Sequence, residues 1–177
     1  MKRKPTFLLL LFFLDFKSYH VMAASADDSL QIIQLWKQSM KLSSAQIATR
    51  DALLNQASYI AKKQNQIELL IKLYHWKAKL YLNNLDYRNA IALANSAVQI
   101  AEFHKKLQTE ASRDAISFLT VIYGEFKADD SCWYWTYKNK LLSKEANDWF
   151  NYSVNLTLEA IFQRDKFDHY KILSLYD

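Results

Sequence analysis

The chain has 177 residues, of which 51% are hydrophobic and 15% aromatic, which is enough for one domain with a hydrophobic core and too apolar for a disordered chain. Gly124 and Pro5 are the only glycine and proline. Because strand-rich folds need many turn-forming residues, this composition argues against a β fold and predicts an all-α class. The net charge is +5, but no concentrated basic segment follows Asp27, so nucleic acid is not an expected partner.

The N-terminal segment has the pattern of a secretory signal peptide. Three basic residues at positions 2–4 precede an unbroken apolar run from Phe7 to Leu14, and small residues stand at Ala24 and Ala26. The apolar run is far shorter than the ~20 residues of a membrane-spanning helix. We therefore expect residues 1–26 to be cleaved near Ala26 on export to the periplasm or medium, which would remove +3 of the net charge. The alternative is an N-terminal helix that stays attached.

Residues 27–177 are expected to form one all-helical domain without a membrane span. Apolar residues recur at three- and four-residue spacing, and short polar joints such as "KLSS", "NNLD" and "KADDS" separate the segments. The predicted helices cover about residues 30–40, 44–63, 67–83, 86–105 and 108–126, then an aromatic helix after Ser131, a helix over about 145–163 and a short one in the tail. Because the joints are short, consecutive helices should pack as antiparallel hairpins.

Two of these segments are similar to each other. "LLNQASYIA" from Leu53 and "LANSAVQIA" from Leu93 start forty residues apart and share Leu, Asn, Ala, Ile and Ala at matching positions. Small residues repeated on one helical face let neighbouring helices approach closely, as a stacked array of hairpins requires. The similarity therefore favours an internal repeat, although alanine-rich amphipathic helices also resemble one another through composition alone.

Residues 74–102 resemble one tetratricopeptide repeat. The large, small and acidic-aromatic positions of that family are matched by Tyr74, Ala78, Tyr81, Asp86, Tyr87, Ala90, Ala94 and Ala97. The chain departs from the family at Leu85, Lys77 and Glu102, where the family has glycine, leucine and proline. The resemblance implies a short α-solenoid of stacked hairpins, with an irregular helical bundle as the alternative. It also implies a binding face on the first helix of the pair, around Tyr74, Lys77, Tyr81 and Asn84, where we expect exposed side chains.

The run "SCWYWTYKNK" from Ser131 has two apolar faces if it is helical. Trp133, Tyr134, Tyr137 and Leu141 fall within one quadrant, which we expect to be core, while Trp135 and Leu142 lie opposite. If the helix continues past Ser143, Trp149 joins this second stripe at seven-residue spacing. Either neighbouring helices cover the stripe, which we favour, or Trp135 and Trp149 meet a partner.

No catalytic or metal-binding pattern is evident. Cys132 follows two aspartates, which disfavour a thiolate, so a buried and inert cysteine is expected. His75, His104 and His169 show no ligand spacing on one helix, and one glycine cannot form a phosphate-binding loop. We therefore expect neither an enzyme nor a cofactor.

The sequence predicts an adaptor or scaffold that binds another protein or a peptide in the cell envelope. Recognition of an extended segment or a helix would be its mechanism. One alternative is a sensory helical bundle that binds a small molecule with Trp133, Tyr137 and Trp149; another is an enzyme whose motifs are not visible. Oligomerisation is possible, and the sequence does not distinguish it from packing within one chain.

Overall fold

The computed structural model describes residues 26–125 and 129–173, so the predicted signal peptide lies outside the described residues. The described residues form α-helices joined by short turns, without a strand, which confirms the all-α class. The helices are α2 (Ala26–Lys41), α3 (Ile47–Lys63), α4 (Ile67–Leu82), α5 (Tyr87–Phe103), α6 (Glu110–Glu125), α7 (Asp129–Glu145) and α8 (Trp149–Leu173); a 3-10 turn (Ser44–Gln46) precedes α3. The tail expected to form a separate short helix instead continues α8.

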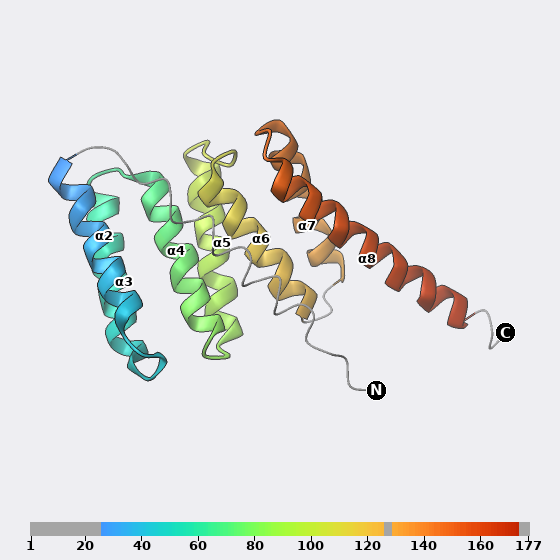
Figure 1. Cartoon of the computed structure of the whole chain (residues 1–177), viewed down its shortest axis with the longest axis horizontal. Helices are drawn as coiled ribbons and strands as arrows, with labels where there is room; N and C mark the ends of the chain where they lie inside the picture. The colour runs from blue at the N-terminus through green and yellow to red at the C-terminus, as the bar shows by residue number, and fades with distance from the viewer. Residues whose placement is uncertain (1–25, 126–128, 174–177) are drawn as a thin grey trace.

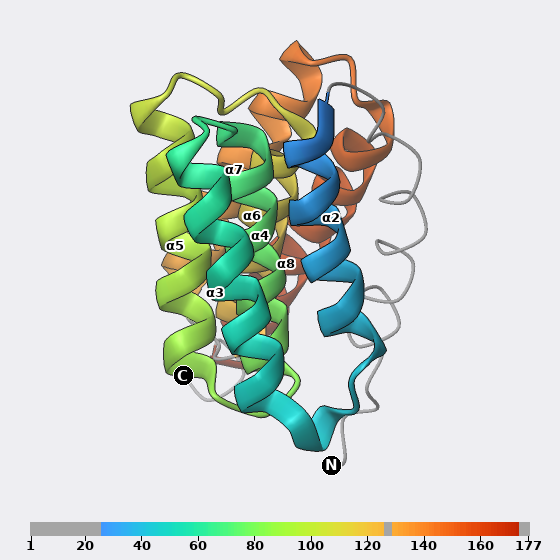
Figure 2. The same cartoon turned by 90° about the vertical axis from the view of Figure 1, so that its left-hand side faces the viewer.

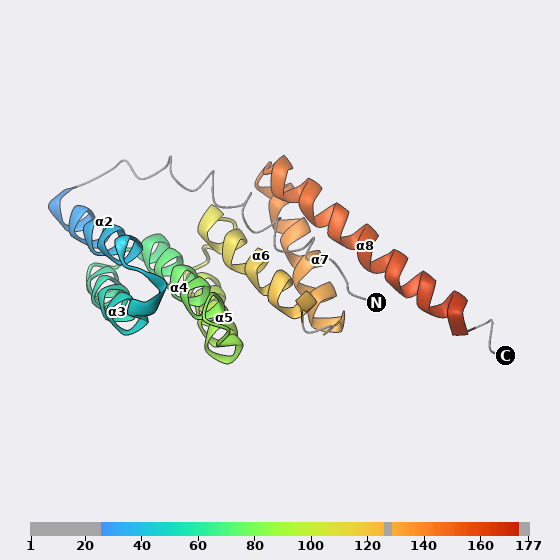
Figure 3. The same ribbon diagram turned by 60° about the horizontal axis from the view of Figure 1, so that its bottom comes forward.

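Consecutive helices pack against each other along the chain. Helices α2 and α3, α4 and α5, and α6 and α7 form successive pairs, and α8 packs on α7 (Figure 1). Helix α4 also contacts α6 directly, so the first helices of two neighbouring pairs share a face. Figure 2 shows α2 and α3 in front, with α4 and α5 behind them. In Figure 3, α8 closes the series and extends well beyond α7.

The core consists of two clusters that meet on α4. The first lies between α2, α3 and α4 and contains Ile32, Leu54 and Leu73. The second lies between α4, α5 and α6, and most of its fully buried residues are alanines: Ala78, Ala90, Ala94, Ala97, Ala101, Ala111 and Ala115. Such small side chains allow the helix axes to approach closely. The repeated alanines noted in the sequence therefore bring α5 against its neighbours.

Four of the turns have the same geometry although none contains glycine. Asn65, Leu85, Lys105 and Asn147 adopt positive φ angles of 55°, 61°, 55° and 54°. In each case the next residue donates its backbone N–H to the carbonyl five residues earlier, as Asp86 does to Tyr81 at 3.0 Å. This is the Schellman arrangement, which satisfies carbonyls that the helix end leaves without partners. The chain therefore makes its tight joints with left-handed asparagine, leucine and lysine.

Within the described part of the chain, no helix combines the length and the apolar composition that crossing a membrane requires.

Candidate functional site

The polar side of α4 lies between the two core clusters. Leu73 and Leu80 pack toward α2 and α3, whereas Ile71 and Ala78 pack toward α5 and α6. The remaining side carries Lys72, His75, Trp76 and Lys79, of which only His75 is buried. Lys72 and Lys79 are seven residues apart, so they lie nearly above one another, about two turns and ~10 Å apart along the axis.

Helix α6 faces this side of α4. The His75 ring meets the Phe118 ring edge-on, with centroids 5.4 Å apart. One turn before Phe118 is Asp114, whose carboxylate interacts electrostatically with Lys72 and Lys79. We call the surface formed by Lys72, His75, Trp76 and Lys79 of α4 with Glu110, Asp114 and Phe118 of α6 the α4–α6 face.

Asp114 is the most perturbed carboxylate of this face. Burial raises its pKa to about 6, and the negative charge of Glu110 adds to the increase. Lys79, Lys72 and Arg113 act in the opposite direction but do not cancel the effect. The surroundings therefore stabilise the ionised carboxylate of Asp114 incompletely, and a ligand that brings a positive charge or hydrogen-bond donors would stabilise it further.

His75 is held neutral by its position. Its side chain is buried between α4 and α6, and burial, assisted by the charge of Lys79, lowers its pKa to about 3. Its Nε2 atom has no hydrogen-bond partner among the described residues. The imidazole thus offers one polar atom to this face without carrying a charge at neutral pH.

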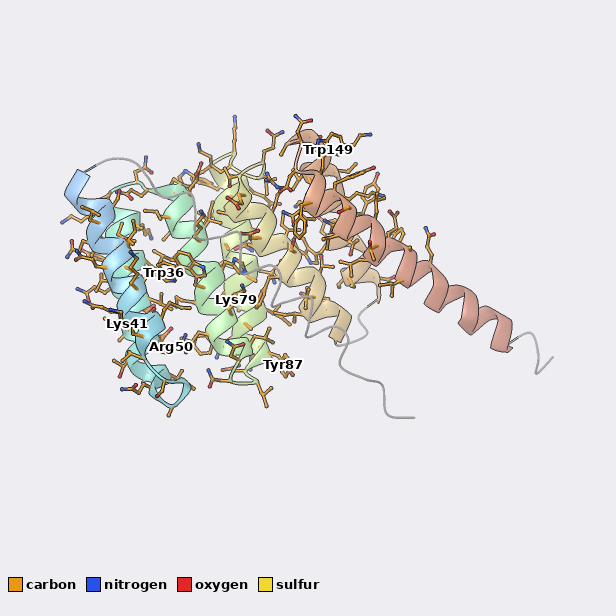
Figure 4. The ribbon with its side chains drawn as sticks, viewed as in Figure 1. Trp36, Lys41, Arg50, Lys79, Tyr87 and Trp149 are labelled. Carbon is orange, nitrogen blue, oxygen red and sulfur yellow. The ribbon has the colours of Figure 1, made fainter. Side chains whose placement is uncertain are left out.

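A pair of stacked tryptophans extends the face toward α2. The rings of Trp36 and Trp76 lie 4.2 Å apart between centroids and are inclined by 17°. Figure 4 labels Trp36 on α2 and Lys79 on α4, and both lie on the side of the molecule that this view presents. Aromatic surface beside half-exposed lysines is suited to contacts with a peptide, because rings supply apolar area while cations supply orientation.

Lys77 lies elsewhere, and the expectation that it is exposed is wrong. Its side chain reaches α3, where Nζ donates to Asn55 Oδ1 at 2.5 Å and lies 3.7 Å from Asp51 Oδ1. Asn55 in turn donates to Asp51 Oδ2 at 2.8 Å. Lys77 occupies the position where the resembling repeats have leucine, so its aliphatic stem is buried while its ammonium is paired between the helices.

The other residues of the predicted binding face are half-buried. Tyr74 packs against both core clusters, and Tyr81 packs against the alanine-rich cluster. Burial and a hydrogen bond to the Asp51 carboxylate raise the pKa of Tyr81. Asn84 donates to the Leu80 carbonyl at 2.6 Å. Tyr74, Lys77, Tyr81 and Asn84 therefore all make contacts within the chain, and none of them belongs to the α4–α6 face.

One of the two apolar faces of α7 differs from the expectation. Tyr134, Tyr137 and Leu141 are exposed, by 54%, 49% and 42%, although they were expected in the core. Trp135 and Leu142 pack against the alanine-rich cluster, as the favoured interpretation of that stripe requires. The buried side of α7 consists of small and polar residues, Cys132, Thr136, Asn139 and Ser143.

Trp149 does not continue the stripe of Trp135. Helix α7 ends at Glu145, and after a turn Trp149 starts α8, where its ring lies edge-on to Tyr152 with centroids 5.9 Å apart. Figure 4 labels Trp149 at the beginning of α8. Trp149 is 60% exposed. Of the three residues considered for a small-molecule pocket, Tyr137 and Trp149 are thus at the surface, and Trp133 is half-buried.

The remaining candidates lie apart from one another. The Cys132 thiol is buried and donates to the Thr120 carbonyl, with Sγ and oxygen 3.2 Å apart. His104 is exposed after α5, and the side chain of His169 lies outside those described. Among the described residues, no group of three histidines, cysteines or carboxylates is arranged to hold a metal ion.

Comparisons with known proteins identify no relative: the chain matches no protein-family model, no curated protein and no solved structure significantly.

Lys72, Trp76, Lys79 and Asp114 were not among the binding residues predicted from the sequence. A signal was present, because Lys72, Trp76 and Lys79 recur at four- and three-residue spacing on one side of α4. That signal was ambiguous, since a polar stripe on a helix is usually just its solvated face. Only the position of α6 shows that Asp114 and Phe118 lie opposite.

Proposed function

We propose that this protein is a non-catalytic adaptor of the cell envelope that binds an extended segment of another protein on the α4–α6 face. The observation that carries the proposal is the combination of Lys72, Trp76 and incompletely stabilised Asp114 on adjacent helices. Together they offer a cation, an aromatic surface and a carboxylate to one ligand. The basic and apolar pattern of residues 1–14 supports export, and the tetratricopeptide-like pattern of residues 74–102 supports protein binding.

The spacing on α4 suits an extended chain. Seven helical residues rise ~10 Å, and one three-residue turn of an extended polyproline II segment rises ~9 Å and returns the side chain to the same side. A segment lying along α4 can therefore place an acidic side chain near Lys72 and another near Lys79, three positions apart. The carboxylate of Asp114 favours a basic residue between or beside them, so we expect a segment of mixed charge.

The test begins with a random peptide library displayed on phage and selected on the intact chain. Affinities of the selected peptides are then measured by fluorescence anisotropy for the wild type, Lys72→Glu and Lys63→Glu. Lys63 is exposed in the last turn of α3 and provides a matched charge reversal away from the α4–α6 face. We expect Lys72→Glu to weaken binding by roughly tenfold or more and Lys63→Glu to leave it unchanged. Equal effects of the two variants would refute the proposed site.

A further inference from the structure

The outward side of α8 carries no charge over three turns. Its exposed residues are Trp149, Phe150, Ser153, Leu156, Thr157 and Ala160, which we call the outer α8 face. The one charged residue between Trp149 and Ala160 is Glu159, which points toward α7 and accepts from Lys140 Nζ at 2.7 Å. Large exposed apolar surfaces of this kind usually mark an interaction site.

The opposite end of the helix series is different. Helix α2 exposes Lys37 and Lys41 together with several glutamines, and these polar side chains surround the exposed Leu30 and Met40. In arrays of stacked helices, a polar outer face on the terminal helix keeps the array soluble. The outer side of α2 meets this requirement, whereas the outer α8 face is uncharged and largely apolar.

We propose that the outer α8 face pairs with the same face of a second copy of this chain, with the two α8 helices antiparallel across a two-fold axis. Side-chain size is distributed unevenly along this face. Its bulky residues, Trp149 and Phe150, stand at the beginning, whereas Thr157 and Ala160 stand toward the end. An antiparallel partner places the bulky part of each helix over the small part of the other.

With the axis near position 155, Phe150 of one copy lies over Ala160 of the other, and Ser153 lies over Thr157. Such alternation of large and small residues is what ridges-into-grooves packing requires. A two-fold interface must be complementary to itself, and a face without charges avoids opposing like charges across the axis. The outer side of α7, although aromatic at Tyr137, carries the exposed ions Lys144 and Glu145 and suits such pairing less well.

Helix α8 is also long enough for this role. Its 25 residues correspond to about 37 Å of helix, and its second half extends beyond α7 (Figures 1 and 3). The proposal does not depend on the α4–α6 face, so either can fail without the other.

The association is tested by analytical ultracentrifugation of the intact chain over about 1–100 µM. We expect a reversible dimer that Leu156→Asp weakens by on the order of 100-fold, because the contact would bury an unpaired carboxylate in each copy. Leu141→Asp on α7 is the matched control, since Leu141 and Leu156 are 42% and 41% exposed. Circular dichroism confirms that both variants are folded. A wild type that stays monomeric, or a dimer that Leu156→Asp leaves intact, would overturn the proposal.

The direction of pairing is tested by cysteine crosslinking between chains of different tag length. A mixture of Ser153→Cys and Thr157→Cys chains should form mixed disulfide dimers in higher yield than either variant forms alone. The buried Cys132 is common to all samples, and the wild type measures its background. Preferential crosslinking of Ser153→Cys chains with one another would indicate a different arrangement and contradict the antiparallel pairing.

Discussion

Arg113 of α6 donates two hydrogen bonds to the same carboxylate oxygen of Asp148, from Nε at 3.2 Å and from Nη2 at 2.9 Å. The Asp148 carboxylate also accepts from the backbone and side chain of Asn151 in the first turn of α8. Burial by itself would raise the pKa of Asp148, but the bonds from Asn151 and Arg113 lower it overall. This ion pair therefore joins the beginning of α6 to the beginning of α8.

Removing the guanidinium should destabilise the protein markedly. Arg113→Ala leaves the half-buried Asp148 carboxylate without its cation, and we expect a loss of about 1–3 kcal/mol in the free energy of unfolding, measured by urea denaturation. The control is Lys106→Ala, because Lys106 and Glu68 form an exposed pair at 3.8 Å whose loss should cost at most ~0.5 kcal/mol. Similar effects of the two substitutions would contradict the structural role of Arg113.

The glycine-free turns give a second prediction. Leu85 adopts a left-handed conformation that is sterically unfavourable for a residue with a Cβ atom. Because its side chain is 72% exposed, packing compensates for little of this steric energy. Leu85→Gly should therefore raise the free energy of unfolding by ~1 kcal/mol. Asn147→Gly is the control, because asparagine tolerates this conformation and should gain only a few tenths. A destabilised Leu85→Gly variant would show that the turn geometry is not limiting.

A third prediction concerns pH. The pKa of Asp114 is raised from 3.8 to about 6, so the folded state binds its proton more readily than the unfolded state. Stability from this residue is present below pH 4 and is lost as the pH rises through 6. Asp114→Asn should consequently stabilise the protein at pH 7 by about 1–2 kcal/mol and leave it nearly unchanged at pH 4. Urea denaturation at both pH values measures the difference, and a constant difference would contradict the burial argument.

The contribution of His75 to stability depends on pH with the opposite sign. Its pKa falls from 6.5 to about 3, so the unfolded state takes up the proton first. Stability from the neutral imidazole is present above pH 6.5 and is lost as the pH falls toward 3. His75→Gln should therefore reduce the loss of stability between pH 7 and pH 4, measured by the same denaturation. An unchanged pH dependence would mean that the imidazole can become charged within the fold.

The class of fold followed from composition and periodicity, because the scarcity of turn formers and the three- and four-residue spacing are local properties of the chain. The faces of α7 did not follow. Apolarity placed Tyr134 and Tyr137 in the core, but α6 packs on the side of Asn139, which donates to Ser117 Oγ at 2.7 Å. Small residues allow close approach, and Cys132 and Asn139 find hydrogen-bond partners on α6 that cannot be read from α7 alone.

The prediction of the candidate binding residues was limited by the same ambiguity. Lys77 and Lys79 look alike in the sequence, yet Lys77 is paired with Asp51 between helices, whereas Lys79 lies on the α4–α6 face near Asp114. Which lysine is packed depends on the directions from which α3 and α6 approach α4. Those directions are set by contacts between residues far apart in the chain, which helical periodicity does not encode.

The central claim is that the α4–α6 face binds an extended segment, and the most direct test is to locate a bound peptide. Backbone amide NMR shifts of the ¹⁵N-labelled chain would be followed while a library-selected peptide is added. The account predicts that the largest shift changes fall on residues 72–79 and 110–118. Changes confined to the aromatic residues of α7 and the start of α8 would contradict it and favour a site around Tyr137 and Trp149.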